Sequence, residues 1–181
     1  MLKIKRLEIP DVVLIEPKVY SDNRGLFFES FNQKKFEQAV GVSLSFFQDN
    51  QSFSEHHVLR GLHYQVKQPQ GKIVRVISGE IYDVAVDLRR SSITFGKWVA
   101  AKLSDANKQQ LWIPPGFAHG FLTLSQSAEV IYKTTSYYDA TDEATIIWND
   151  SKLNIAWPSI SPILSPKDKN GLCFEQSKLY Y

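Results

Sequence analysis

The sequence predicts an all-β fold, a sandwich or barrel built from many short strands around one core. Segments rich in β-branched and aromatic residues recur at short, fairly even intervals along the 181 residues. Gly, Pro, Asn and Asp cluster between these segments, where turns are expected. Only one segment has the apolar spacing of a helix. These three observations favour an all-β architecture, of which the jelly roll is one form.

The predicted strands are separated by turn signals such as Ser78-Gly79-Glu80 and Pro114-Pro115-Gly116. In chain order, the segments with a strand pattern are Val12–Ile15, Gly25–Ser30, Leu59–Gln65, Lys72–Ser78, Ile81–Leu88, Lys97–Leu103, Gln110–Ile113, Gly120–Leu124, Ala128–Tyr137 and Ala144–Asn149.

A single short helix is predicted between the second and third of these strands. Asn32 is a suitable N-cap, Phe36, Ala39 and Val40 supply apolar spacing of three and four, and Gly41 supplies the stop. The proline-rich tail from Trp157 to Pro166 is expected to wrap around the strands. We therefore predict one domain spanning residues 1–181.

Composition excludes several classes of protein. Hydrophobic residues make up 43% of the chain, which fits a globular protein with a core. The net charge is +2 and no basic stripe is present, so no nucleic-acid partner is expected. No apolar segment has the length of a membrane span, and Met1–Arg6 is not followed by a signal-peptide core. Cys173 is the only cysteine, which favours a reducing compartment and hence a cytoplasmic protein.

Several cations lie within segments that have a strand pattern. Lys72 alternates with Val74 and Val76, so an inward-facing valine side would carry Lys72 inward as well. The same parity argument links His63 to Leu59. A buried cation is costly unless an anion meets it, which suggests a binding site. The alternative is that these residues end their strands at a solvated rim.

His63 is the best candidate for a general base, because histidine titrates nearest neutral pH. Lys72 is a candidate for stabilising a developing oxyanion, or alternatively a strand-end lysine that reaches water. Tyr132 shares parity with Val130 and is either a core tyrosine or a proton donor.

His119 lies in a turn that leads into an apolar strand, where a histidine is a possible metal ligand. Gln65 is a poor additional ligand, and after His63 no carboxylate follows until Glu80, so we expect neither a metal nor another cofactor. Arg24, Arg60 and Lys167 are candidates for binding phosphate. Strand parity places Arg60 and His63 on opposite faces, so either Gly61 marks a β-bulge or Arg60 does not reach the same pocket.

The chain resembles the dTDP-4-dehydrorhamnose 3,5-epimerases, a metal-free branch of the cupin-like jelly rolls, nearly from end to end. The resemblance implies a cupin-like jelly-roll barrel with one short helix and a C-terminal wrapping tail. It rests on blocks that include Asp22-Asn23-Arg24-Gly25-Leu26-Phe27-Phe28-Glu29, Gln48-Asp49-Asn50, Leu59-Arg60-Gly61-Leu62-His63-Tyr64-Gln65, Gly71-Lys72-Ile73-Val74-Arg75-Val76, Pro114-Pro115-Gly116-Phe117-Ala118-His119-Gly120-Phe121, Tyr132-Lys133 and Ser165-Pro166-Lys167-Asp168.

The resemblance also implies a substrate and a role for each site residue. The substrate would be a 4-keto-6-deoxyhexose carried on dTDP, inverted at C3 and C5 in dTDP-rhamnose biosynthesis. His63 would remove each proton with Asp168 orienting its ring, Lys72 would stabilise the enolate oxygen, and Tyr132 would return a proton from the opposite face. The implied diphosphate, nucleotide and sugar contacts are Arg24, Arg60, Tyr20, Phe27, Glu29, Gln48, Asn50, His119, Tyr138, Glu143 and Lys167.

In the family, the N-terminal strand lies across the partner of a homodimer, so Tyr20, Arg24, Phe27 and Glu29 would serve the neighbouring pocket. Tyr20 stands where phenylalanine is frequent, and Ala144-Thr145 replaces a charged or glycine-containing pair. Two alternatives stay open from the residues alone. One is a 3- or 5-epimerase that performs a single inversion, and the other is a non-catalytic sugar-binding cupin.

Overall fold

The computed structural model describes residues 2–159 and 161–180, and this part of the chain is built mainly from strands. They are β1 Lys3–Arg6, β2 Val13–Glu16, β3 Tyr20–Asp22, β4 Gly25–Phe27, β5 Gln48–Glu55, β6 Leu59–Gln65, β7 Lys72–Ser78, β8 Glu80–Asp87, β9 Trp98–Ser104, β10 Gln110–Ile113, β11 Phe117–Thr123, β12 Ser127–Thr134 and β13 Glu143–Thr145. The helices are α1 Gln33–Val40, α2 Pro166–Lys169 and the 3₁₀ turn η1 Phe174–Gln176.

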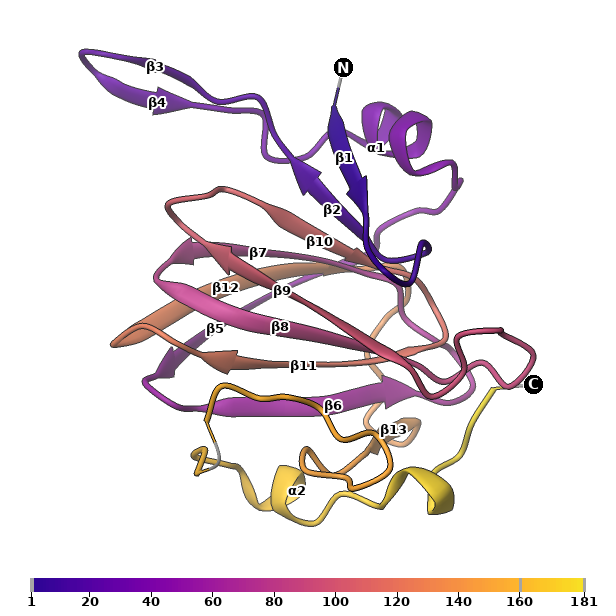
Figure 1. Cartoon of the computed structure of the whole chain (residues 1–181). Helices are drawn as coiled ribbons and strands as arrows, with labels where there is room; N and C mark the ends of the chain where they lie inside the picture. The colour runs from indigo at the N-terminus through magenta and orange to yellow at the C-terminus, as the bar shows by residue number, and fades with distance from the viewer. Residues whose placement is uncertain (1, 160, 181) are drawn as a thin grey trace.

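Two antiparallel sheets face each other, as Figure 1 shows. One has the order β1-β2-β10-β7-β12-β5 and the other the order β13-β6-β11-β8-β9, and they do not close into one continuous barrel. Their facing sides enclose an apolar cluster that includes Val74, Val130, Leu103, Leu111 and Phe121. The predicted all-β class is therefore confirmed, with the two sheets packed as a sandwich.

Each sheet is also covered on its outer side. Helix α1 packs Phe36 and Val40 against Val13 and Trp112 of the six-stranded sheet. The segment after β13 lies along the five-stranded sheet, where Trp157 joins the cluster of Leu59 and Leu62 (Figure 1). The C-terminal wrapping tail is thus confirmed. The sequence does not predict α2 and η1, which are single turns that follow the proline-rich segment.

Helix α1 begins and ends where its capping residues predict. The side chain of Asn32 accepts a hydrogen bond from Lys35 N, and Gly41 adopts a left-handed conformation with φ of 84°. Both devices satisfy backbone groups that the short helix would otherwise leave unpaired.

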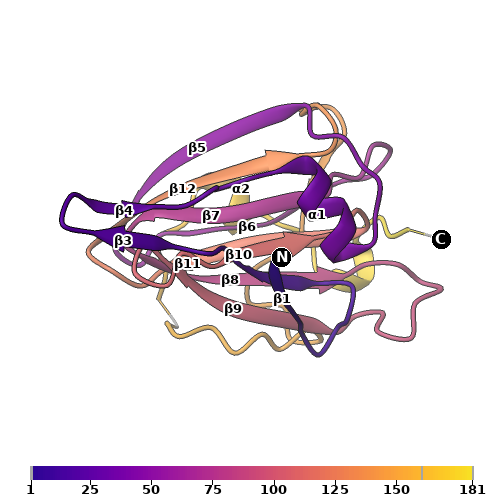
Figure 2. The same cartoon turned by 90° about the horizontal axis from the view of Figure 1, so that it is seen from above.

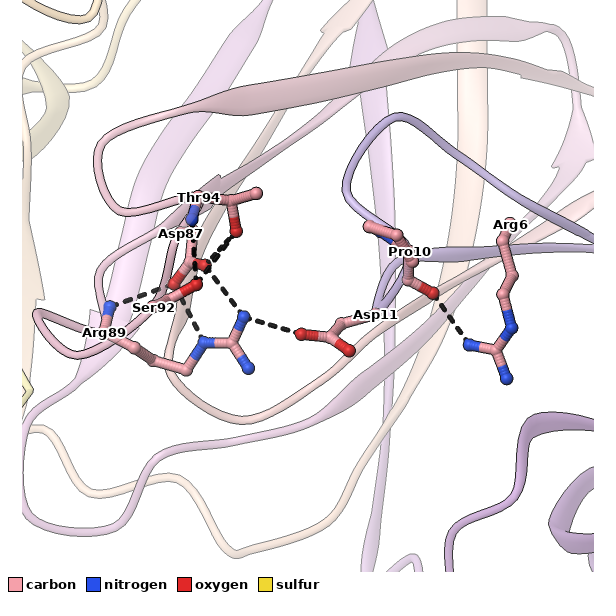
Figure 3. A network of polar contacts seen from close by, with 7 residues as sticks. All are labelled: Arg6, Pro10, Asp11, Asp87, Arg89, Ser92 and Thr94. Carbon is pink, nitrogen blue, oxygen red and sulfur yellow. Dashed lines mark hydrogen bonds and ion pairs between the residues drawn. The ribbon is translucent and has the colours of Figure 1, made fainter.

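A polar network fixes the turn between β1 and β2. The buried Asp87 accepts two hydrogen bonds from the Arg89 guanidinium, at 2.9 and 2.8 Å, and one from Thr94 at 2.7 Å (Figure 3). Arg89 also donates to Asp11 at 2.7 Å. Burial raises the pKa of Asp87, but these hydrogen bonds outweigh it and hold the pKa below its usual range. The ion pairs therefore attach the N-terminal segment to the end of β8.

Strands β3 and β4 form a hairpin that pairs with neither sheet. It extends past the ends of the sheets in both Figure 1 and Figure 2. Tyr20, Leu26 and Phe27 are all exposed, with Phe27 at 70%. An isolated two-stranded hairpin with exposed aromatic residues lacks the packing that normally stabilises such a unit.

The predicted strand bounds are correct for β6, β7 and β10. The sequence does not predict β1, β3 or β5. The predicted C-terminal ends of β4, β12 and β13 lie too far along the chain, since these strands end at Phe27, Thr134 and Thr145. Strand β11 begins at Phe117, three residues earlier than expected. No helix in residues 2–159 and 161–180 has the length and apolarity needed to cross a membrane.

Candidate active site

A cavity of about 320 Å³ is lined by residues of both sheets. Its polar lining comes from both sheets and from the segments next to β13. The lining residues are Gln48, Asn50, Ser52, Arg60, His63, Lys72, His119, Phe121, Tyr132, Tyr138, Glu143 and Lys167. This volume lies in the range typical of small-molecule sites.

A β-bulge brings Arg60 and His63 to the same pocket. His119 pairs with His63 and Phe121 pairs with Arg60, so two steps along β11 face three steps along β6. The extra residue is absorbed at Gly61, whose φ is 117°. A Cβ atom there would lie 2.6 Å from the Cα of Gly120, so the position requires glycine.

The parity argument that linked His63 to Leu59 is therefore wrong. Leu59 packs in the cluster under the C-terminal segment, on the face opposite to the pocket. His63 faces the pocket because the bulge reverses the alternation between these two residues. The parity of Lys72 with Val74 and Val76 is correct, since both valines belong to the cluster between the sheets and Lys72 is buried.

His63 and Asp168 form a hydrogen-bonded pair. His63 Nε2 lies 2.5 Å from Asp168 Oδ1. Asp168 is placed by the first turn of α2, where Ser165 accepts from Asp168 N and donates to Asp168 Oδ2 at 2.7 Å. Burial raises the pKa of Asp168, but the hydrogen bonds from His63 and Ser165 outweigh it and the pKa falls below its usual value. An ionised Asp168 accepts the proton on Nε2 and leaves Nδ1 of a neutral His63 as the basic nitrogen.

Lys72 is buried in the pocket without a direct partner. Only 7% of the residue is exposed, and within the described chain its ammonium makes no hydrogen bond or ion pair. Burial lowers its pKa to about 8, against the opposing attraction of Asp83 and Glu143. At neutral pH the group is therefore mainly a cation, poorly solvated and available to an anionic atom.

Tyr132 approaches the same space from the facing sheet. It lies on β12, beside Asn50 of β5, whereas His63 lies on β6 of the other sheet. Burial raises its pKa, so the hydroxyl keeps its proton at neutral pH and can act as an acid. A molecule bound between the sheets would meet a base on one side and an acid on the other.

A second histidine–carboxylate pair lies beside the first. His119 Nε2 is 2.6 Å from Asp83 Oδ1, and both side chains are buried. Burial lowers the pKa of His119, although the attraction of Asp83 opposes this shift. The lowered pKa favours the neutral ring. Nε2 then donates to Asp83, and Nδ1 remains able to accept a hydrogen bond from a substrate hydroxyl.

Glu143, Lys167 and Tyr138 form a charged rim at the mouth of the pocket. Lys167 donates to both oxygens of Glu143 at 2.9 Å, and the Tyr138 hydroxyl donates to Glu143 Oε2 at 3.0 Å. Burial raises the pKa of Glu143, but the combined effect of Lys167, His63 and Tyr138 is larger and lowers the pKa below its usual value. The carboxylate is therefore ionised. Gln48 accepts from Tyr138 N at 2.8 Å and thereby joins β5 to this rim.

The structure separates the predicted site residues into two groups. His63, Lys72, Tyr132 and their eight companions meet in one pocket, including Asp168 through its bond to His63. Four others lie elsewhere, because Tyr20, Arg24 and Phe27 belong to the projecting hairpin and Glu29 pairs with Lys35 at 2.8 Å. Arg24 itself pairs with Asp22 in the hairpin turn.

Sequence reasoning missed Ser52, Phe121 and Asp83 as members of the site. Phe121 shares parity with His119, and Ser52 shares parity with Gln48 and Asn50, so alternation was an available signal for both. Asp83 had no such signal, because only the pairing of β8 with β11 brings it to His119. No group of three or more potential metal-binding side chains occurs within the described ranges.

The chain is similar to known proteins over nearly its whole length. The family model described as dTDP-4-dehydrorhamnose 3,5-epimerase matches residues 6–176. A dTDP-4-dehydrorhamnose 3,5-epimerase from Pseudomonas aeruginosa is 55% identical over 180 residues, covering 99% of each chain. The chain belongs to the dTDP-4-dehydrorhamnose 3,5-epimerase family. It is accordingly an isomerase, an epimerase of sugar nucleotides, as the resemblance implied.

Solved epimerase structures confirm the cupin-like jelly roll. A dTDP-6-deoxy-D-glucose-3,5-epimerase from Legionella pneumophila, in complex with dTDP-4-keto-L-rhamnose, superimposes with a TM-score of 0.95 at 48% identity, covering 97% of this chain and 94% of that one. A 3′-monoepimerase from Streptomyces bikiniensis, in complex with dTDP-quinovose, gives a TM-score of 0.87 at 33% identity, covering 93% and 86%. Epimerases that invert different numbers of centres thus share this fold.

Proposed function

We propose that the chain inverts C3 and C5 of dTDP-4-dehydro-6-deoxy-D-glucose to give dTDP-4-dehydro-L-rhamnose. The observation that carries this proposal is the arrangement of four groups around one cavity. His63 stands on one sheet, with Asp168 of α2 bonded to it, and Lys72 and Tyr132 stand on the sheet that faces it. Family membership supports the same reaction.

The first step is removal of a proton from a carbon next to the C4 ketone. Both C3 and C5 flank this ketone, so loss of either proton gives an enolate. Nδ1 of His63 takes the proton, and Asp168 stabilises the imidazolium that forms while holding the ring in place. Using one base for both carbons requires only that the sugar present each carbon in turn.

Lys72 stabilises the enolate oxygen at C4. A buried ammonium without a carboxylate in hydrogen-bond contact is strongly attracted to negative charge that develops within its reach. Because the substrate ketone is neutral and the enolate is not, this attraction favours the intermediate more than the bound substrate.

Tyr132 returns a proton from the opposite face of the sugar. A base that gave back its own proton to the face from which it came would restore the starting configuration. Inversion therefore needs an acid on the other side, and the raised pKa of Tyr132 keeps its hydroxyl protonated. The facing positions of β6 and β12 provide this geometry.

The remaining pocket residues bind the nucleotide and sugar. Arg60 and Lys167 supply positive charge for the diphosphate, and Tyr138 offers an exposed ring at the rim. His119 and Asn50 supply acceptors and donors for sugar hydroxyls.

The active unit is a homodimer with shared pockets. The hairpin β3–β4 carries Tyr20, Arg24 and Phe27 away from the pocket of its own chain, exposed and unpaired with either sheet. Isologous pairing would let each hairpin cover the partner's pocket and add Arg24 to its diphosphate site. We place the enzyme in the cytoplasm, where it acts on a small nucleotide sugar and binds neither nucleic acid nor membrane.

Proton exchange in deuterated water tests the reaction directly. The dTDP-4-keto sugar is incubated with the enzyme and followed by proton NMR. Deuterium at both C3 and C5, together with formation of the L-rhamno product, is the expected result. Deuterium and inversion at one carbon only would identify a monoepimerase, and exchange at neither carbon would identify a non-catalytic sugar-binding protein.

A further inference from the structure

The side chain of Gln65 connects the strand of the catalytic base to a loop at the pocket mouth. Gln65 is the last residue of β6, two positions after His63, and only 2% of it is exposed. Its amide forms three hydrogen bonds. Nε2 donates to Gln68 O at 2.9 Å and to Tyr137 O at 3.2 Å, and Oε1 accepts from Asp139 N at 2.7 Å.

Two of these bonds are made to the peptide groups on either side of Tyr138. Tyr137 O belongs to the peptide that precedes Tyr138, and Asp139 N belongs to the peptide that follows it. One planar amide that binds both groups restricts the backbone rotations of Tyr138 from the two sides. Tyr138 N is held separately by Gln48.

This loop has no sheet ladder to fix it. Strand β12 ends at Thr134 and β13 begins at Glu143. Between them, backbone hydrogen bonds form only toward the two ends, from Thr135 N to Gly71 O and between Asp142 and its neighbours Val66 and Asp139. The backbone of residues 136–138 is held by side chains instead. The Tyr138 side chain is 51% exposed and lines the cavity, so it receives little packing from its own chain. The Gln65 amide therefore fixes the backbone on both sides of Tyr138, while Glu143 holds the hydroxyl of its ring at the rim.

We propose that Gln65 is a positioning residue for Tyr138 and that it sets the affinity of the pocket for the nucleotide part of the substrate. The proposal rests on the proposed function, in which Tyr138 contacts the nucleotide. Gln65 does not line the cavity, and its side chain forms no hydrogen bond with Lys72 or Tyr132 in the described chain. Its loss changes nucleotide binding, and the chemical step stays intact.

The test uses Gln65→Met, which keeps the length of the side chain and removes all three hydrogen bonds. We expect the Kd for dTDP, measured by calorimetry, and the KM for the dTDP-4-keto sugar to rise about tenfold. We expect kcat to change by less than about twofold. A large fall in kcat with unchanged KM would show that Gln65 acts on the chemistry instead, and would overturn the proposal.

A double variant separates positioning from general damage. In the Tyr138→Ala background the ring is already absent, so Gln65→Met is expected to add less than about twofold to the Kd. If Gln65→Met raised the Kd for dTDP by the same factor with and without the Tyr138 ring, the proposal would be contradicted. The matched control is Gln70→Met, which removes a single amide bond to Ser136 O in the same loop without flanking Tyr138. Its Kd for dTDP is expected to stay near that of the wild type.

Hydrogen exchange of the unliganded protein gives a readout that does not depend on the substrate. Gln65→Met is expected to speed exchange in residues 136–142 and to leave β12 protected. Unchanged exchange there would refute positioning, whatever binds in the pocket. If the wild type fails to bind dTDP, the substrate assignment fails, and exchange still decides the role of Gln65. Should the methionine variant not fold, Gln65→Asn is one methylene too short to bridge both peptides and must give the same selective effects.

Discussion

Replacing Lys72 by methionine is expected to stabilise the fold while removing most of the activity. Lys72 carries its charge into a buried position where, within the described chain, no carboxylate contacts it directly. The folded protein therefore bears the cost of desolvating an ammonium, and the unfolded chain does not. Methionine fills a similar volume without a charge.

The magnitude follows from the displaced pKa. Burial lowers the pKa of Lys72 from 10.5 to about 8, so folding disfavours the protonated form. This difference corresponds to about 3 kcal/mol of lost stability at pH 7. The penalty is complete below pH 8 and fades as the pH rises toward 10.5, because the folded protein then no longer holds the proton. At pH 9 about 2 kcal/mol remains.

Urea unfolding of the wild type and Lys72→Met at pH 7 and pH 9 measures this penalty, at one fixed protein concentration because association into the proposed dimer would add to stability. The variant is expected to be more stable, with a gap that narrows at pH 9. Lys102→Met, at an exposed position on β9, is the control and should show no such gap. Turnover of the variant is expected to fall about 10²–10³-fold. A variant no more stable than the wild type, or a gap independent of pH, would refute the reasoning.

Four further outcomes are expected. His63→Ala lowers turnover by about 10²–10⁴-fold or more and leaves dTDP binding nearly unchanged. A variant that keeps more than about a tenth of the wild-type rate would contradict the assignment of His63 as the base. Tyr132→Phe slows epimerisation more than deuterium exchange, because His63 still forms the enolate; equal losses by NMR would end this division of labour. Dialysis against a chelator leaves the rate unchanged, and loss restored by a divalent ion would show the opposite. Mixing Arg24→Ala with His63→Ala restores activity toward about half that of the wild type per mixed dimer, since one pocket then carries neither change. No recovery, with subunit exchange confirmed, would mean that each chain builds its own site.

The sequence predicts the fold class and the apolar strands well because these depend on local pattern. Strands β6, β7 and β10 have the expected bounds, and α1 ends at its predicted capping residues. Strand β5 was not predicted, because its alternating residues Gln48, Asn50 and Ser52 face a polar pocket and not an apolar core. Strand patterns read from hydrophobicity fail where the interior is itself polar.

The site was less predictable because it depends on contacts between distant strands. Parity suggested correctly that Lys72 and Tyr132 face inward, but it failed for His63, since one extra residue at Gly61 reverses the alternation. The approach of Asp168 to His63 spans 105 residues and came only from family resemblance. Tyr20, Arg24 and Phe27 lie on a hairpin that pairs with neither sheet, so no contact within the described chain places them at the pocket.

The two walls of the pocket differ in how far they can be redesigned. At the bulge, Gly61 and Gly120 face each other so closely that a Cβ atom on either would meet the backbone of the other strand. Strand β5 is instead the edge of its sheet, with β12 as its sheet neighbour, so changes of its side chains disturb only one strand pairing. A library intended to make the enzyme accept new sugars would therefore randomise Gln48, Asn50 and Ser52 and keep both glycines constant.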